Sequence, residues 1–148
     1  MIHTMKKAIS SLCKPALCIF TFITFSYIAA AQWYDPEKVN RKAGEIYGHA
    51  YEEAQDGRYL EAIRHLDEAL KLDPKFVDVY LSRAGIHANL KDYASSVRDF
   101  STAISMDPVY SQAYMLPYSI SLAGTGNFSK ALEVSLISNP NGPGGRSI

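Results

Sequence analysis

Hydrophobic residues recur at intervals of three and four along much of the chain, which is the spacing of one face of an α-helix. The clearest stretch is 59–72, whose apolar positions are Leu60, Ile63, Leu66, Ala69 and Leu70. The dipeptide Asp73-Pro74 follows at once, and proline has no amide hydrogen with which to continue a helix. The pattern predicts a helix over 59–72 that buries one face and ends before the proline.

The same pattern returns 34 residues further along the chain. The stretch 91–108 aligns with 57–74, and both stretches end in Asp-Pro. Within the alignment, Phe100 falls on Leu66. A period of about 34 residues is typical of helical hairpins that stack into a solenoid. The repeat therefore predicts a scaffold of paired helices.

Further helices are expected on the same criteria over 35–55, 75–90, 94–106, 109–123 and 128–137. The first is expected to begin at Asp35-Pro36, because aspartate is a preferred N-cap and proline is tolerated at the first helical position. Trp33 and Tyr34 should then pack back on this helix. Lys91 replaces the turn residue Gly57 and needs a backbone φ that lysine tolerates. Pro117 should kink the helix over 109–123.

The first 31 residues have the pattern of a cleaved secretory signal. Lys6, Lys7 and Lys14 provide a basic beginning, and the apolar run ALCIFTFITFSYIAA follows over 16–30. Small residues at Ala29 and Ala31 suit the signal peptidase, so cleavage is expected after Ala31. A membrane span needs about 20 apolar residues, so the shorter run favours a signal over an anchor, although an uncleaved anchor stays an alternative. The predicted location is secreted or periplasmic, with no membrane span after cleavage.

Composition narrows the function classes. Three of the 15 basic residues lie in 1–31, which leaves 12 basic against 15 acidic side chains in the remainder. An acidic remainder argues against a nucleic-acid partner, which would need a basic face. Both cysteines, Cys13 and Cys18, are lost with the signal, so no disulfide framework or catalytic thiol is expected. The tail 138–148 is rich in glycine, proline and serine and predicts a disordered segment.

The residues at the helix crossings and turns resemble those of the tetratricopeptide repeat family. One unit, 43–76, shares Ala50, Gly57, Tyr59, Ala62, Ala69 and Asp73-Pro74 with that pattern. A second unit, 77–110, shares Tyr80, Ala84, Tyr93, Phe100, Ala103 and Asp107-Pro108, with Ser96 in place of the early alanine. A third unit, 111–137, keeps Tyr114, Phe128 and Ala131, but its turn comes one residue late. The segment 32–42 would serve as the start and cap.

The resemblance implies an all-α fold, a right-handed superhelical stack of five or six antiparallel helices with two good repeats and a degenerate third. More loosely, the chain resembles the N-terminal part of larger secreted bacterial envelope proteins. In those proteins a signal peptide and a few such repeats precede a β-propeller-like region and a peptidoglycan-binding domain. This second resemblance implies a shortened relative or a fragment.

Catalytic chemistry has little support in the sequence. His49, His65 and His87 fall at repeat positions that do not obviously converge, so a metal or catalytic role is not expected. The acidic groups around Glu52-Glu53 and Asp67-Glu68 are better explained as solvated helix faces, with ion pairs such as Asp67–Lys71. We expect no enzyme activity and no cofactor, and an enzyme using Glu52, Glu53 and His49 is the least favoured alternative.

The family resemblance places any binding site on the concave face, which the first helix of each unit lines. Projected onto this chain, that lining comprises Tyr47, Tyr51, Gln55, Asp78, Leu81, Asn89, Gln112 and Met115. Family members that clamp a peptide carboxylate need lysine and asparagine at Tyr47/Tyr51 and Leu81/Gly85, so that clamp is absent. The groove should favour apolar or mixed peptide segments. Alternatively, these side chains simply pack against one another.

The predicted function is a non-enzymatic scaffold that binds a protein or peptide partner in an extracytoplasmic compartment. The alternative is a structural component of cell-envelope assembly. Repeat stacks usually need about three units and polar ends. The frayed third unit should therefore leave an apolar flank near Tyr118, Leu122, Leu132 and Leu136, through which the chain could self-associate or dock.

Overall fold

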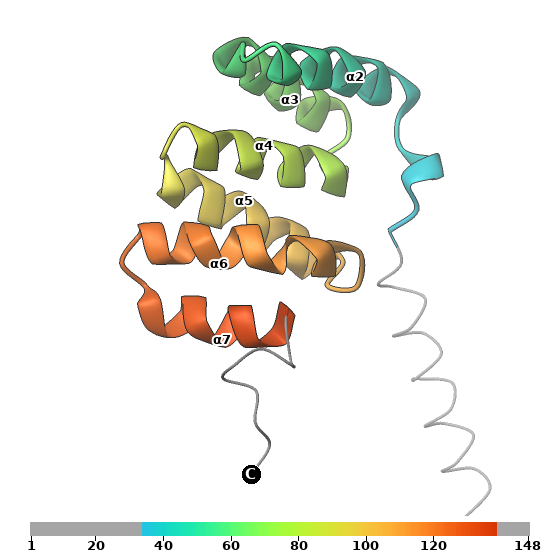
Figure 1. Ribbon diagram of the computed structural model, residues 1–148. Coiled ribbons are helices and arrows are strands. Elements are labelled where there is room, and N and C mark those ends of the chain that lie inside the picture. The colour runs from blue at the N-terminus through green and yellow to red at the C-terminus, as the bar shows by residue number, and fades with distance from the viewer. Residues whose placement is uncertain (1–33, 139–148) are drawn as a thin grey trace, which may run out of the picture. The chain divides into compact units, whose positions relative to one another are not determined.

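The computed structural model describes residues 34–138, which are helical and contain no strand. Their six α-helices are α2 (Arg41–Gln55), α3 (Tyr59–Leu72), α4 (Val77–Asn89), α5 (Tyr93–Met106), α6 (Met115–Gly124) and α7 (Phe128–Ser138). Two short 3-10 helices, η1 (Pro36–Lys38) and η2 (Tyr110–Tyr114), complete this part of the chain. The α-helices pack as consecutive antiparallel pairs in one stack (Figure 1). The predicted all-α solenoid is confirmed. The predicted signal at 1–31 and the tail from 139 lie outside the described residues.

Each helical hairpin turns in the same way. The turn residues Gly57, Lys91 and Gly126 have φ values of 77°, 61° and 83°. The next amide in each turn donates to a carbonyl five residues back: Arg58 to Glu53 at 2.8 Å, Asp92 to His87 at 2.9 Å and Asn127 to Leu122 at 3.0 Å. This left-handed turn closes a helix by satisfying its last carbonyls. Lys91 therefore adopts a conformation that favours glycine.

Replacing Lys91 by glycine should stabilise the fold. A side chain in the left-handed region costs about 1–2 kcal/mol, and glycine's greater freedom in the unfolded chain offsets part of the gain. We expect Lys91→Gly to raise the free energy of unfolding by about 0.5–1 kcal/mol. Gly57→Ala should lower it by a similar amount. Urea unfolding followed by circular dichroism measures both, and a lower midpoint for Lys91→Gly would contradict the prediction.

Small residues stand where the paired helices come closest. Ala43 and Ala50 of α2 and Ala62 and Ala69 of α3 are fully buried. The second pair repeats the arrangement with Ala84, Ser96 and Ala103. Protein interiors are close-packed, so a larger side chain at these positions would wedge the helices apart. The predicted packing role of these residues is confirmed.

The first helix begins later than predicted. Asp35 does act as a cap, but the helix that it starts is only η1, and the backbone is extended again at Val39. A second cap, Asn40, then accepts hydrogen bonds from the amides of Lys42 and Ala43 and starts α2 at Arg41. The prediction of one helix from Asp35 was wrong because two capping residues follow each other within five positions.

The third unit also differs from the expectation. η2 replaces the first turn that α4 has at the equivalent place, and α6 begins only at Met115. The extra residue of this unit is thus absorbed at η2, before the turn at Gly126. Pro117 is the third residue of α6, where a backbone amide has no partner within the helix. The predicted interior kink at Pro117 was therefore wrong.

The segment Tyr34–Asn40, which we call the N-terminal strap, is tied to both loops between units. The amide of Asn40 donates to Asp73 Oδ2 at 2.9 Å, and the amide of Tyr34 donates to Asp107 Oδ2 at 2.8 Å. The Tyr34 ring meets the Tyr110 ring edge-on at 4.8 Å between centroids. The hydrogen bonds of Tyr34 are therefore with the later units. Its side chain also packs against the core cluster that includes Ala43 and Ala50 of α2, the helix on which it was predicted to pack. Trp33 lies outside the described residues.

Arg83 links three helices through carboxylates. From α4 it donates twice to Asp99 of α5, each time at 2.7 Å, and once more to Asp67 of α3. Hydrogen bonding to Asp99 is the main reason that the pKa of Arg83 is raised, so the guanidinium stays charged. The structure pairs Asp67 with Arg83 and not with Lys71.

No helix within residues 34–138 is both long enough and apolar enough to cross a membrane.

Asp107 should make the fold sensitive to acid. Burial alone would raise the pKa of Asp107, but hydrogen bonds from the amides of Tyr110, Tyr34 and Val109 outweigh burial and lower it. A carboxyl whose pKa is lower in the folded state stabilises the fold above its unfolded pKa of about 3.9. That contribution is lost as the pH falls through the folded pKa.

We therefore expect the urea concentration at the unfolding midpoint to decrease as the pH is lowered from about 5 to about 2. In Asp107→Asn this decrease should be less steep. Asparagine keeps an oxygen for the loop amides but has no charge to titrate. Urea unfolding at a series of pH values measures the two slopes. Equal slopes for the two proteins would show that Asp107 does not supply this dependence.

Candidate functional site

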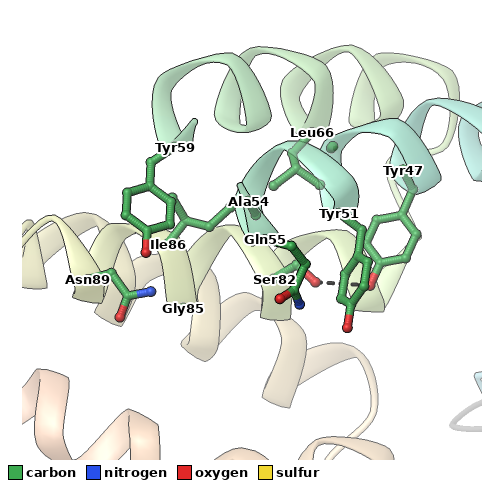
Figure 2. A pocket seen from close by; sticks show the side chains of 11 residues that line it. Tyr47, Tyr51, Ala54, Gln55, Tyr59, Leu66, Ser82, Gly85, Ile86 and Asn89 are labelled. Atoms are coloured by element: carbon green, nitrogen blue, oxygen red, sulfur yellow. Dashed lines mark hydrogen bonds between the residues drawn. The ribbon is translucent and has the colours of Figure 1, made fainter. Parts of the chain in front are cut away.

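A pocket of about 380 Å³ opens between α2 and α4 (Figure 2). α2 contributes Tyr47, Ala50, Tyr51, Ala54 and Gln55, α3 contributes Tyr59 and Leu66, and α4 contributes Ser82, Gly85, Ile86 and Asn89. Because α2 and α4 are the first helices of consecutive units, the pocket lies on the face that the sequence assigned to binding.

Helical periodicity brings these side chains together. Tyr47, Tyr51 and Gln55 are four residues apart, so they form one stripe along α2. Ser82 and Asn89 lie on the facing stripe of α4, with Gly85 between them. In Figure 2, Tyr47 and Tyr51 stand at one end of the pocket, and Tyr59 and Asn89 stand at the other. The pocket is the space between two matched helix faces.

Tyr47 is held in place by its neighbours. Its hydroxyl lies 3.0 Å from Ser82 Oγ, which bridges α2 and α4. Its ring centroid is 5.2 Å from that of Phe76. Burial raises the pKa of Tyr47, so its hydroxyl stays protonated and can donate or accept. Tyr51, by contrast, is 54% exposed and stands at the mouth of the pocket.

Gly85 leaves space in the pocket wall. A Cβ added at Gly85 would have no atom within 4 Å. Glycine in the middle of a helix costs about 0.5–1 kcal/mol relative to alanine. The packing around Gly85 does not require a glycine, because a larger side chain at this position would meet open space. The free volume is therefore available to a ligand.

The pocket lining carries no charged side chain. Its polar groups are the hydroxyls of Tyr47, Tyr51, Tyr59 and Ser82 and the amides of Gln55 and Asn89. Such groups can both donate and accept hydrogen bonds. A carboxylate or phosphate entering here would lose its hydration without meeting a cation. The lining suits uncharged polar groups beside apolar or aromatic ones.

The structure divides the eight predicted lining residues into two groups. Tyr47, Tyr51, Gln55 and Asn89 line the pocket together. The other four, Asp78, Leu81, Gln112 and Met115, lie outside it. Leu81 and Met115 are only 2% and 8% exposed and belong to the core. Their predicted place on an open surface was wrong, while partner binding by the pocket group stays a prediction.

Asp78 has a structural role instead. Its two carboxylate oxygens accept hydrogen bonds from Tyr34 at 2.7 Å and from Tyr110 at 2.6 Å. Burial and the hydrogen bond to Asp78 raise the pKa values of both tyrosines, so their hydroxyls remain donors. Asp78 therefore anchors the N-terminal strap to the start of α4 and is not free to meet a ligand.

The error in the third unit comes from the inserted residue. The hydrogen bond between Tyr118 of α6 and Ser101 of α5 is equivalent to the one between Arg83 of α4 and Asp67 of α3. Tyr118 follows Arg83 by 35 residues, so equivalent positions of α4 and α6 are 35 residues apart. With this spacing, Leu116 and Ile120 occupy the positions of Tyr47 and Tyr51, and both are exposed. Sequence reasoning used a spacing of 34 and chose Gln112 and Met115. The residues missed in the pocket include Tyr59, Ser82 and Gly85.

The three histidines do not meet. His49 is exposed on α2, His65 Nδ1 lies 2.6 Å from Glu53 Oε2, and His87 Nδ1 lies 3.4 Å from Asp92 Oδ2. Each of the last two contacts connects the two helices of one hairpin or its turn. Within residues 34–138 no group of three potential metal ligands comes together.

Fold and site together define a helical-hairpin repeat protein with a pocket between successive first helices. Comparison with known families gives the repeat its name. A model described as "TPR repeat" matches residues 50–91, and one described as "Tetratricopeptide repeat" matches residues 77–110. Residues 50–110 therefore match models of the tetratricopeptide repeat.

Known proteins have sequences related to part of this chain. The chain is 30% identical over 86 residues to the Hsp70-Hsp90 organizing protein of Triticum aestivum, covering 56% of this chain and 14% of that protein. It is 32% identical over 80 residues to the small glutamine-rich tetratricopeptide repeat-containing protein 2 of Saccharomyces cerevisiae, covering 54% of this chain and 23% of that protein.

A third relative carries the name of an enzyme. The chain is 34% identical over 53 residues to the UDP-N-acetylglucosamine--peptide N-acetylglucosaminyltransferase of Giardia intestinalis, covering 36% of this chain and 4% of that protein. The chain thus spans less than a quarter of the length of each of these three relatives. The similarity supports a shared repeat segment.

Proposed function

We propose that the chain is a non-enzymatic interaction module that holds an uncharged segment of a protein partner in the pocket between α2 and α4. The observation that carries the proposal is a pocket of about 380 Å³ with no charged lining and an open wall at Gly85. The name of one relative, an organizing protein for Hsp70 and Hsp90, supports a protein partner.

The pocket chemistry defines the segment. An apolar or aromatic side chain would enter the space over Gly85, between the rings of Tyr51 and Tyr59 and the side chain of Ile86. The amides of Gln55 and Asn89 would pair with peptide groups of the segment, since each can donate and accept. Beyond the pocket, exposed Ile120 and Leu116 on α6 would meet further apolar side chains.

A free carboxylate is not the expected recognition group. Binding a carboxylate strongly requires a cation or several charge-assisted donors, and the lining has neither. Arg83, the most buried guanidinium near these helices, is already paired with Asp67 and Asp99. An internal segment of a partner therefore fits the pocket better than a C-terminal end.

Filling the pocket should weaken this binding. We expect Gly85→Leu to lower the affinity for the selected peptides tenfold or more, and a tenfold change corresponds to about 1.4 kcal/mol of binding free energy. Gly48→Leu is the matched control, because Gly48 is also a helical glycine with open space where a Cβ would stand, but it does not line the pocket. A displayed random-peptide library, followed by fluorescence anisotropy on the selected peptides, supplies the ligands and the affinities.

The selected peptides should be uncharged at the central positions and contain an apolar or aromatic residue. Selection of sequences that end in a required carboxylate would contradict the proposed chemistry. Equal affinity of the two glycine variants would place binding elsewhere on the molecule.

We also propose that the module works outside the cytoplasm. The support is the basic start, the apolar run and the small residues Ala29 and Ala31 at the predicted cleavage site. N-terminal sequencing of the protein recovered from its native host should begin at Gln32. Ala31→Arg should block processing because the peptidase pocket admits only small side chains. A native protein that begins at residue 1 would contradict the proposal.

A further inference from the structure

α7 presents a hydrophobic stripe that nothing else within residues 34–138 covers. Phe128, Leu132 and Leu136 follow one another at intervals of four, so they lie along one face of the helix. Phe128 is 70% exposed, Leu132 is 62% exposed and Leu136 is 37% exposed. Ala131 and Val134, on a neighbouring face of α7, are buried. Side chains of this size rarely remain open to water in a row.

The equivalent positions on α5 show what such a stripe does in this fold. Thirty-five residues earlier stand Tyr93, Val97 and Ser101, which face the next helix, α6. A Cβ on Gly124 of α6 would lie 2.4 Å from the ring of Tyr93. Ser101 Oγ lies 3.0 Å from the Tyr118 hydroxyl of α6. The stripe on α7 is thus in the position by which a second helix of a unit holds another helix.

The other end of the stack is built differently. α4 packs on the first unit through Val79, Arg83 and Ile86. The positions of α2 that lie 34 residues earlier are Glu45, His49 and Glu52, and all three are exposed. Packing them against an apolar stripe would remove the Glu52 carboxylate and the Glu45–Arg41 ion pair from water, and the stripe offers neither of them a hydrogen bond in return. The α2 end therefore does not complement the α7 end.

We propose that the α7 stripe pairs with the α7 stripe of a second copy of this chain. An antiparallel pairing about a two-fold axis at Leu132 places Phe128 of each copy against Leu136 of the other. The interface is then apolar on both sides, and the helix dipoles oppose each other. The polar α2 end excludes head-to-tail growth, so association stops at two copies. This inference is independent of the proposed peptide binding.

The expected dimer is of modest affinity. Stable complexes typically bury about 1,200–2,000 Å² of surface, and an interface of one helix per copy buries less than this. The full chain should therefore show a concentration-dependent equilibrium between one and two copies over about 1–300 µM. Analytical ultracentrifugation measures it directly.

Substitutions on the stripe test the interface. Leu132→Glu should raise the dimer dissociation constant about a hundredfold or more, since two carboxylates would meet at the axis. Leu60→Glu is the control, because Leu60 is exposed on α3 and lies away from α7. Every variant retains residues 1–33, so association through that segment would survive Leu132→Glu and would overturn the proposal.

Mixing two variants tests the symmetry. Leu132→Lys and Leu132→Glu should each be monomeric alone and should form a mixed dimer when combined, because Leu132 faces itself only across a two-fold axis. Failure of the mixture to associate would overturn the two-fold arrangement. A wild-type chain that stays monomeric throughout the concentration range, or one that grows beyond two copies, would overturn the pairing of α7.

Discussion

The close approach of helices at fully buried alanines and serines is the constraint on which this structure depends. Ala50 and Ala62 set the distance within the first hairpin, and Ser96 meets Ser121 with their hydroxyl oxygens 2.8 Å apart where α5 crosses α6. Because interiors are close-packed, these contacts fix how far each helix stands from the next. The width of the pocket between α2 and α4 follows from this spacing, so the architecture and the proposed binding site have one physical origin.

Polar contacts then set the angle between units. Arg83 carries charge-assisted hydrogen bonds to the helices on both sides of α4, and Asp73 and Asp107 hold the N-terminal strap across the two loops between units. Buried charges are costly unless paired, so these contacts contribute more to orientation than to net stability. They keep α4 in a fixed relation to α2, and they leave Ser82, Gly85 and Asn89 of α4 facing the pocket.

The sequence predicted the repeat well because period, small residues and Asp-Pro terminators are local signals that tertiary contacts reinforce. The family resemblance, projected in this repeat register, placed Tyr47, Tyr51, Gln55 and Asn89 on the concave face, and these four residues line the pocket. Prediction from the sequence failed where the local signal was ambiguous, as at the two successive caps Asp35 and Asn40. The prediction of the third-unit lining residues also failed, because one inserted residue changed the register. The sequence did not show whether that residue would be accommodated at η2 or in the turn at Gly126. The contacts of Tyr34 with Asp78 and Asp107 join residues 44 and 73 positions apart, a separation that no local pattern reports.

The two ends of the stack have different consequences for binding. The polar α2 end is stable in water, and the apolar α7 end gains free energy by being covered. The pocket lies between α2 and α4, in the units furthest from α7, so pairing of two chains through α7 would leave both pockets open. A partner with two suitable segments would then bind the second pocket at a high effective concentration, which strengthens attachment without any new contact. A modest pocket affinity can therefore be sufficient for a module of this size.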